Sequence, residues 1–256
     1  MTDADHTNGG RLQGRVAVVT GAAAGMGAAI TSRFLSEGAT VIAADVDSSA
    51  LEQLHERLSV GERLSIVTAD VASPDGADGI AATATAKAGF VDILVNNAGI
   101  LASQSFETMT FEEWRRVIDV NLHGVFLVTK AIFPLMRSRG SGRIINMGSS
   151  SFFAGTPKAS HYVASKGGVI GFSRSLASEL GRYGITVNVV TPGLTMTENV
   201  RRRTAPELIE LRRQQRPLAR DQVAEDIVGT VLFLASADAE FVTGQTINVD
   251  GGTVKH

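Results

Sequence analysis

The sequence predicts an α/β fold: a doubly wound sheet of seven parallel strands with helices on both faces. Three observations support this prediction. Short apolar runs rich in β-branched residues alternate along the chain with longer segments of helical period, in the order strand, helix, strand. The runs are almost continuously apolar, as strands buried on both faces are. Glycine or polar residues end them, at the edge of the sheet where such folds bind ligands.

Seven apolar runs are expected to form the strands, and right-handed crossovers through helices would keep them parallel. The first run, RVAVVT, is followed by a helical segment that ends near Glu37, and the second run, TVIAAD, ends at Asp45. Two long helices are expected at 111–137 and 161–180, with mixed apolar faces that could pair across a two-fold axis. The expected strands cover residues 15–20, 40–45, 64–70, 91–99, 142–150, 185–193 and 245–252.

Composition narrows the class of protein. The 256 residues are 44% hydrophobic, enough for one substantial core, so residues 1–256 are interpreted as a single domain with a flexible lead-in at 1–13. The 24 basic and 26 acidic residues leave a net charge of −2, which disfavours nucleic acid and anionic membranes as partners. No apolar run reaches membrane-spanning length, and a cytoplasmic protein is expected by default. The chain has no cysteine, and we expect no metal site.

The first strand runs into the sequence TGAAAGMG, which then opens a helix. Gly21, Gly25 and Gly27 would let the backbone turn sharply and approach a pyrophosphate, whose charge suits the free amides at a helix start. A tight strand-to-helix turn without any ligand is the alternative. Asp45 favours phosphate binding, because it closes the second strand about where a carboxylate would accept hydrogen bonds from both ribose hydroxyls of an adenosine.

The cofactor is predicted to be NAD, with NADP less favoured. The Asp45 carboxylate would repel a 2′-phosphate, and neither the glycine turn nor Val46 supplies a compensating cation. Asp70 and Val71 follow the third strand, and NNAG at 96–99 follows the fourth, so each could line the adenosine. Turn capping by Asp70 and loop hydrogen bonds by the asparagines are the alternatives.

The sequence YVASK places Tyr162 four residues before Lys166 in an expected helix, so both side chains lie on one face. A free phenol has a pKa of about 10. At roughly 4 Å and an effective dielectric of about 20, the lysine charge would favour the phenolate by up to about 4 kcal/mol and bring the pKa of Tyr162 near neutrality. Such a tyrosine could protonate an alkoxide formed from a ketone, or deprotonate an alcohol, while a nicotinamide carries the hydride.

Ser149 ends the fifth strand, thirteen residues before Tyr162, and could hydrogen-bond the carbonyl oxygen of a substrate. Ser150 and Ser151 are alternatives for this role, and serines after a strand are also common turn formers. A nucleophilic serine is not expected, because neither a G-x-S-x-G turn nor an ordered histidine and acid pair accompanies it.

Together, the motifs TGAAAGMG, NNAG, SSSFFAGTPKASHYVASK and TPG resemble the short-chain dehydrogenase/reductase family in its classical form, whose fold is Rossmann-like. The resemblance extends from about residue 14 to 252. It implies a homotetramer and a catalytic group of Asn121, Ser149, Tyr162 and Lys166, in which the asparagine holds a water that links the lysine to solvent. A buried amide capping a local kink is a compatible role for Asn121.

The same resemblance assigns the contacts with the cofactor. The glycine loop would hold the pyrophosphate, the residues after the second to fourth strands would hold the adenosine and its ribose, and TPGLTMT would grip the carboxamide. The implied cofactor-binding residues are Gly21, Gly25, Met26, Gly27, Asp45, Val46, Asp70, Val71, Asn97, Ala98, Gly99, Tyr162, Lys166, Pro192, Gly193, Thr195 and Thr197.

The expected substrate is a small molecule, a secondary alcohol or ketone with an apolar body; a 3-oxoacyl thioester of acyl carrier protein or coenzyme A is the nearest alternative. The phenylalanines of the pocket could equally be core packing, and His161 is interpreted as a rim residue. A catalytically silent NAD-binding regulator is a third interpretation, which the intact catalytic group disfavours. The expected pocket residues are Ser149, Phe152, Phe153 and Met196, with Leu101, Ala154, His161 and the segment 198–216 around them.

Overall fold

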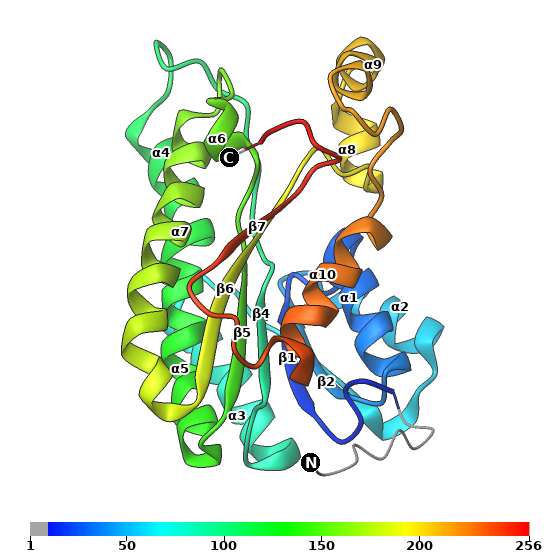
Figure 1. The fold of residues 1–256 in the computed structure, drawn as a ribbon, viewed down its shortest axis with the longest axis vertical. Coiled ribbons are helices and arrows are strands. Elements are labelled where there is room, and N and C mark those ends of the chain that lie inside the picture. The colour runs from blue at the N-terminus through cyan, green and yellow to red at the C-terminus, as the bar shows by residue number, and fades with distance from the viewer. Residues whose placement is uncertain (1–9, 256) are drawn as a thin grey trace.

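The computed structural model of the chain describes residues 10–255, except for the side chain of residue 203. A single sheet of seven parallel strands runs through them in the order β3-β2-β1-β4-β5-β6-β7 (Figure 1). The predicted doubly wound α/β fold is therefore confirmed. The strands are β1 (Val16–Thr20), β2 (Thr40–Asp45), β3 (Leu64–Thr68), β4 (Ile93–Asn96), β5 (Gly142–Met147), β6 (Ile185–Pro192) and β7 (Thr246–Val249).

The strand order reverses between β1 and β4, which are neighbours in the middle of the sheet. The chain winds outward from β1 through β2 to β3, then returns to β4 and winds the other way. At such a switch point the loops after the two strands diverge and leave a crevice beyond their carboxyl ends. The glycine turn after β1 and the segment at 96–99 after β4 therefore face each other.

Helices cover both faces of the sheet, and each face has its own hydrophobic core (Figure 1). One core packs α1 (Gly25–Ser36), α2 (Ser48–Leu58) and α10 (Glu225–Ala235) against the sheet. The other packs α3 (Pro74–Ala88), α5 (Gly124–Arg139) and α7 (Ser160–Leu180). The shorter α4 (Phe111–Ile118), α6 (Ser151–Ala154), α8 (Glu198–Arg203) and α9 (Pro206–Gln214) lie beyond the carboxyl ends of the strands.

The structure describes only part of the lead-in expected at 1–13. Residues 1–9 lie outside the described residues. Residues 10–13 are packed on the body: Leu12 is buried, and its backbone amide donates to the carbonyl oxygen of Glu37 at 3.0 Å. Leu12 fills a place in the first core, and the flexibility of the lead-in stays a prediction.

The long helix expected at 111–137 is divided by a π-helical turn. A capping box formed by Thr110 and Glu113 starts α4, the turn covers Asp119–His123, and α5 continues to Arg139. Among the described residues this is the one helix long and apolar enough to cross a membrane. Its buried residues, among them Val128 and Ile132, belong to the second core, so we interpret it as a core helix.

Candidate active site

The glycine turn after β1 is shaped by close backbone packing. Gly21 and Gly25 have φ angles of +62° and +54°, a region that favours glycine. A Cβ atom on Gly27 would lie 1.9 Å from the carbonyl oxygen of Gly21, and one on Gly25 would lie 2.9 Å from Cγ2 of Thr197. The three glycines thus form a tight cradle at the start of α1, and α8 lies against it through Thr197.

Hydrogen bonds fix this cradle to the segment after β4. The hydroxyl oxygen of Thr20 accepts from the backbone amides of Asn97 and Ala98, both at 3.1 Å. The side-chain amide of Asn97 donates to the carbonyl oxygens of Thr20 and Gly21, both at 3.0 Å. The side chain of Asn97 is therefore one of the loop-bonding amides that the sequence allowed as an alternative, while the backbone at 97–99 still lines the crevice.

A cleft of about 1060 Å³ lies over the switch point and contains most of the predicted cofactor residues. Gly27, Tyr162, Lys166, Pro192, Gly193 and Thr195 do not line it. Arg57 of α2, Arg115 and Arg116 of α4 and Arg202 of α8 line the cleft as well, and of these only Arg202 belongs to a segment expected near the site, 198–216. The predicted residues that line the cleft are Gly21, Gly25, Met26, Asp45, Val46, Asp70, Val71, Asn97, Ala98, Gly99 and Thr197.

Asp45 ends β2 at the wall of this cleft. Its carboxylate accepts from the backbone amide of Ala23 at 3.0 Å and from that of Asp47 at 3.2 Å. Two amide donors hold the charged group in place beside the glycine turn. The side chain of Val46 is 65% exposed, which leaves the neighbouring surface apolar. Arg57 lines the same cleft and has no hydrogen bond or ion pair with any described residue, so it is a cation that the sequence argument missed.

Asp70 and Val71 lie in the turn after β3. The Asp70 carboxylate accepts from the backbone amide of Ala72 at 2.9 Å, which is the turn-capping role allowed as an alternative. Val71 is buried and packs against Gly124, where a Cβ atom would lie 2.9 Å from Cγ2 of the valine. Both residues line the cleft, so capping and a place beside an adenosine are compatible.

Helix α7 brings Tyr162 and Lys166 together, as their spacing predicts. The Lys166 nitrogen lies 5.8 Å from the centre of the Tyr162 ring, and it donates to the carbonyl oxygen of Met147 at 2.7 Å. The Ser149 side chain is hydrogen-bonded to the Tyr162 hydroxyl. Met147 is the last residue of β5 and Ser149 lies two residues further, so the carboxyl end of that strand positions both contacts.

The expected pKa of Tyr162 near neutrality is wrong for this structure. Burial raises the pKa of Tyr162 above its ordinary value of 10.0, and the hydrogen bond with Ser149 only partly opposes that effect. Burial also lowers the pKa of Lys166 to about 8. The expectation assumed a charged lysine close to the phenol oxygen, whereas the buried Lys166 donates to Met147 and has lost much of the solvation that favours its charge.

Asn121 lies in the π-helical turn and is fully buried. Its side-chain oxygen accepts from the backbone amide of Ile100 at 2.8 Å, and its nitrogen donates to the Ile100 carbonyl at 3.0 Å and to the Ser165 hydroxyl at 3.2 Å. The amide is therefore buried at a helix kink, but its side chain bonds to the loop after β4 and to α7 and does not cap the turn itself. A Cβ atom on Gly99 would lie 3.1 Å from the Asn121 oxygen and 3.6 Å from the Lys166 nitrogen, so the cleft lining adjoins the catalytic group.

The segment after β6 joins the site from the other side. Gly193 donates its backbone amide to the carbonyl oxygen of Val249 at 3.1 Å, and Thr195 is buried in a bridge with Gln222. Thr197 caps α8 by accepting from the amide of Val200 at 3.3 Å. The TPGLTMT sequence at 191–197 therefore ends β6 at Pro192 and continues as an ordered strap to α8.

The expected substrate residues come from separate parts of the chain: α6, the loop after β4 and the segment after β6. Phe152 and Phe153 of α6 pack edge to face with ring centres 5.1 Å apart, and Phe152 also packs over Gly167 of α7. Met196 is buried, and Leu101 is 57% exposed. None of them lines the cleft over the switch point. Their role in a substrate pocket stays a prediction.

His161 is not the rim residue that the sequence suggested. Its side chain is fully buried on α7, and neither ring nitrogen has a hydrogen-bond partner among the described residues. The buried row of the helix continues through Ser165 and Val169 at intervals of four, and His161 is the first member of that row. Its position in the row was the signal that could have indicated burial. No group of three or more metal-binding side chains was found between residues 10 and 255.

Comparisons with known proteins agree with this geometry. The family model described as Enoyl-(Acyl carrier protein) reductase matches residues 21–254. A 3-oxoacyl-[acyl-carrier-protein] reductase of Synechocystis sp. is 40% identical over 246 residues, which are 95% of this chain and 98% of that protein. A 2,3-dihydroxy-2,3-dihydro-p-cumate dehydrogenase of Pseudomonas putida is also 40% identical, over 94% of this chain and 95% of that protein.

A crystal structure of a short-chain dehydrogenase/reductase from Brucella melitensis, titled glucose/ribitol dehydrogenase, superposes with a TM-score of 0.91. The two chains are 32% identical, and the match covers 97% of this chain and all of the other. The glycine cradle, the crevice at the switch point and the Tyr162 and Lys166 pair thus occur in a chain that matches characterised oxidoreductases almost from end to end. The protein belongs to the short-chain dehydrogenase/reductase family of oxidoreductases.

Proposed function

We propose that this protein is an NAD(H)-dependent oxidoreductase that interconverts a secondary alcohol and a ketone, with Tyr162 as the acid and base. One observation carries the proposal: the buried Ser149 and Lys166 and the partly buried Tyr162 form a polar group beside Gly99, which lines the cleft over the switch point. A substrate held at that group would be next to the ligand in the cleft.

The residues present fit a nicotinamide dinucleotide. The cradle leaves no room for a Cβ atom at Gly25 or Gly27, so backbone alone faces the place where a pyrophosphate would approach. Asp45 would accept from the ribose hydroxyls of the adenosine, and the strap from Pro192 to Thr197 would hold the carboxamide. When bound, the nicotinamide supplies or accepts the hydride.

The protein groups would handle the proton and orient the substrate. The Ser149 hydroxyl would donate to the carbonyl oxygen of a ketone. Because burial raises the pKa of Tyr162, the phenol keeps its proton at neutral pH and can pass it to that oxygen as the negative charge develops there. After this proton transfer, a charged Lys166 near the Tyr162 ring would favour the phenolate form of the tyrosine. The protonated phenol suits the direction of ketone reduction.

Asp45 supports NAD as the preferred cofactor. Its fixed carboxylate stands at the wall of the cleft where the adenosine ribose would lie, and a 2′-phosphate there would meet a like charge. Arg57 in the same cleft is the one observation that favours NADP. We propose that the Asp45 carboxylate determines the preference for NAD over NADP, because two backbone amides hold it in place while Arg57 is solvent-exposed.

The substrate proposal is a ketone or secondary alcohol with an apolar body. The names of several relatives favour a 3-oxoacyl thioester as the second candidate: the proteins of Synechocystis sp. and Escherichia coli are both 3-oxoacyl-[acyl-carrier-protein] reductases, and a relative from Thauera aromatica is a dehydrogenase of a succinyl-CoA derivative. The name of the dihydroxy-dihydro-p-cumate dehydrogenase supports a further candidate substrate, a cyclic alcohol that is not bound to a carrier.

A homotetramer is also proposed. The exposed side of α5 and α7 carries Phe126, whose side chain is 49% exposed and packs edge to face on Phe172 with ring centres 6.4 Å apart. This apolar pair would be covered if two copies met along their long helices. Light scattering of the purified protein tests this assembly, and a monomer at micromolar concentration would contradict it.

The function is tested by the oxidation of NADH, and separately of NADPH, with a panel of ketones. The panel contains 3-oxoacyl thioesters of coenzyme A and of acyl carrier protein, simple aliphatic ketones and cyclic ketones. We expect turnover that is faster with NADH than with NADPH. Binding of NADH without turnover of any member would instead favour the silent regulator.

A further inference from the structure

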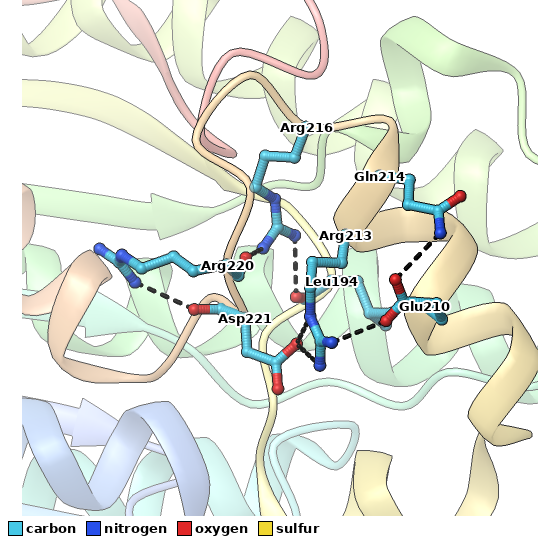
Figure 2. Close-up of polar contacts among 7 residues, drawn as sticks. All are labelled: Leu194, Glu210, Arg213, Gln214, Arg216, Arg220 and Asp221. Carbon is cyan, nitrogen blue, oxygen red and sulfur yellow. Dashed lines mark hydrogen bonds and ion pairs between the residues drawn. The ribbon is translucent and has the colours of Figure 1, made fainter.

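The helices α8 and α9 form an arm whose two ends meet at one buried side chain. The arm covers residues 197–215 and stands at the carboxyl edge of the sheet (Figure 1). It begins directly after the strap from Pro192 to Thr197, and it returns to the body at Arg216. The guanidinium of Arg216 donates to the carbonyl oxygen of Leu194 at 3.2 Å and to that of Arg220 at 2.7 Å (Figure 2).

Neighbouring contacts join the same two stretches of chain. Met196 donates its backbone amide to the carbonyl oxygen of Gln222 at 2.7 Å, and Leu218 donates its amide to that of Gly251 at 3.1 Å. A Cβ atom on Gly251 would lie 2.5 Å from Cδ of Arg216, so the end of the chain packs directly on the arginine. Arg216 is thus enclosed between the strap, the return of the arm and the segment after β7.

Arg216 differs from the other arginines of the arm in its burial and in its partners. Its side chain is 6% exposed, and its Nε atom has no hydrogen-bond partner among the described residues. No carboxylate of residues 10–255 forms an ion pair with it, and burial lowers the pKa of Arg216, although Asp250 and Asp221 partly oppose that effect. Burying a guanidinium on neutral acceptors costs more than burying an apolar side chain of equal size. Stability of the fold alone gives no reason for arginine here.

Two neighbouring arginines, Arg213 and Arg220, fix only the return of the arm. Arg213 donates to a carboxylate oxygen of Asp221 through two nitrogens, at 3.1 and 3.0 Å, and to Glu210 at 2.6 Å (Figure 2). Arg220 forms a two-point ion pair with Asp226 at 2.7 and 2.6 Å. These pairs are solvent-accessible and lie on the C-terminal side of the arm. Arg216 alone among these arginines reaches the strap.

We infer that Arg216 is a positioning residue for the cofactor: it ties the strap at Leu194 to the return of the arm, and thereby holds Pro192 to Thr197 in the conformation that receives the nicotinamide carboxamide. This inference rests on the proposed function of the strap. Two side-chain donors on one rigid fork set the spacing of the two carbonyls, which a point charge cannot do to the same degree.

The test compares Arg216→Met and Arg216→Lys with Arg212→Met in the full chain. Arg212 lies on the same arm but is hydrogen-bonded only to Gln215, at 3.2 Å, so it is the matched control. Two properties are measured: the dissociation constant of NADH by fluorescence titration, and hydrogen exchange of the backbone amides at 197–215 and in the sheet. Neither measurement requires a known substrate.

We expect Arg216→Met to raise the dissociation constant of NADH about tenfold, as loss of a charge-assisted hydrogen bond does. Amides at 197–215 should exchange faster while those of β5 and β6 keep their wild-type rates. Arg216→Lys should fall between wild type and Arg216→Met, and Arg212→Met should match wild type. Unchanged NADH binding by Arg216→Met, or faster exchange across the whole sheet, would overturn the inference.

The proposed function can fail separately. If the wild-type protein does not bind NADH, the proposed cofactor is wrong, and the exchange rates at 197–215 still show whether Arg216 holds the arm. If the wild type binds NADH and Arg216→Met folds poorly, Arg216→Lys decides: wild-type binding and exchange in that variant would contradict a role for the fork.

Discussion

The Lys166 ammonium donates a hydrogen bond of 2.7 Å to the carbonyl oxygen of Met147, and its burial lowers the pKa of the lysine to about 8. An unfolded chain would keep this proton up to an ordinary pKa of 10.5. Between about pH 8 and 10 the unfolded state therefore holds a proton that the folded state has released. Raising the pH through that window stabilises the folded state.

We expect the free energy of unfolding to contain a rising contribution from Lys166 of about 2 to 3 kcal/mol over that window. Denaturant titrations at several pH values, with Lys166→Met as the control, measure it as the difference between the two proteins. The window ends near the unfolded pKa of 10.5, because above it neither state holds the lysine proton. A flat difference between the two proteins would contradict the lowered pKa.

Tyr162→Phe should remove turnover and leave the cofactor bound. The variant keeps the ring in its buried place but has no proton to give, so kcat should fall by about 10²- to 10⁴-fold with little change in the dissociation constant of NADH. Tyr183→Phe is the matched control, because the chain has only two tyrosines and Tyr183 packs edge to face on Phe133 at the far end of α7. Wild-type turnover in Tyr162→Phe would remove the tyrosine from the reaction.

Asp45→Asn should change the choice of cofactor. The amide oxygen can still accept from the amide of Ala23, but the negative charge at the ribose is gone. We expect the ratio of kcat/KM for NADH over that for NADPH to fall by about tenfold or more. Arg57→Met should lower the efficiency with NADPH only, and Asp78→Asn, an exposed acid of α3, should change neither. An unchanged ratio in Asp45→Asn would mean that the carboxylate does not discriminate.

Gly27→Ala should abolish dinucleotide binding without unfolding the protein. The new Cβ atom would lie 1.9 Å from the carbonyl oxygen of Gly21, so the turn has to open. Gly79→Ala in α3 is the control, because a Cβ atom there meets nothing within 4 Å. Calorimetric titration with NADH should show no binding for Gly27→Ala and wild-type binding for Gly79→Ala. Equal binding by the two variants would show that the cradle does not hold the ligand.

His161→Leu should raise stability. The histidine buries two ring nitrogens without partners among the described residues, and each unsatisfied buried polar group costs on the order of 1 kcal/mol or more. The midpoint of urea unfolding should increase by an amount that corresponds to about 1 kcal/mol. His55→Leu, at a partly exposed position in α2, should give no such gain. A lower midpoint for His161→Leu would show that the imidazole has a partner in solution.

The positions of the strands could be predicted from the sequence because parallel strands buried on both faces have continuous apolar sequences. The predicted strand at 40–45 has the same bounds as β2, and the others overrun mainly at their carboxyl ends, where residues such as Asp70 and Gly99 belong to the following loop. The candidate cofactor residues at those ends could be found because glycine or polar residues interrupt the apolar runs there. The family resemblance then assigned roles that strand patterns alone could not.

Properties that depend on packing in three dimensions could not be predicted. The pKa of Tyr162 was expected to fall because spacing along a helix shows that a lysine is near, but not that burial weakens its effect. The arginines of the cleft come from three separate helices, so no local motif contains them. The partners of Arg216 lie on loops whose meeting only the folded chain reveals.

The π-helical turn at Asp119–His123 means that this helix contains one residue more than regular winding accommodates. The wider turn absorbs that extra residue, so deleting one residue from it would restore regular α-helical winding and leave the faces of α4 and α5 in place. Asn121 would then swing away from Ile100 while the core at Val128 and Ile132 kept its place. The extra residue thus sets the direction of one side chain: with it, the helix both packs on the core and points the Asn121 amide at the loop after β4.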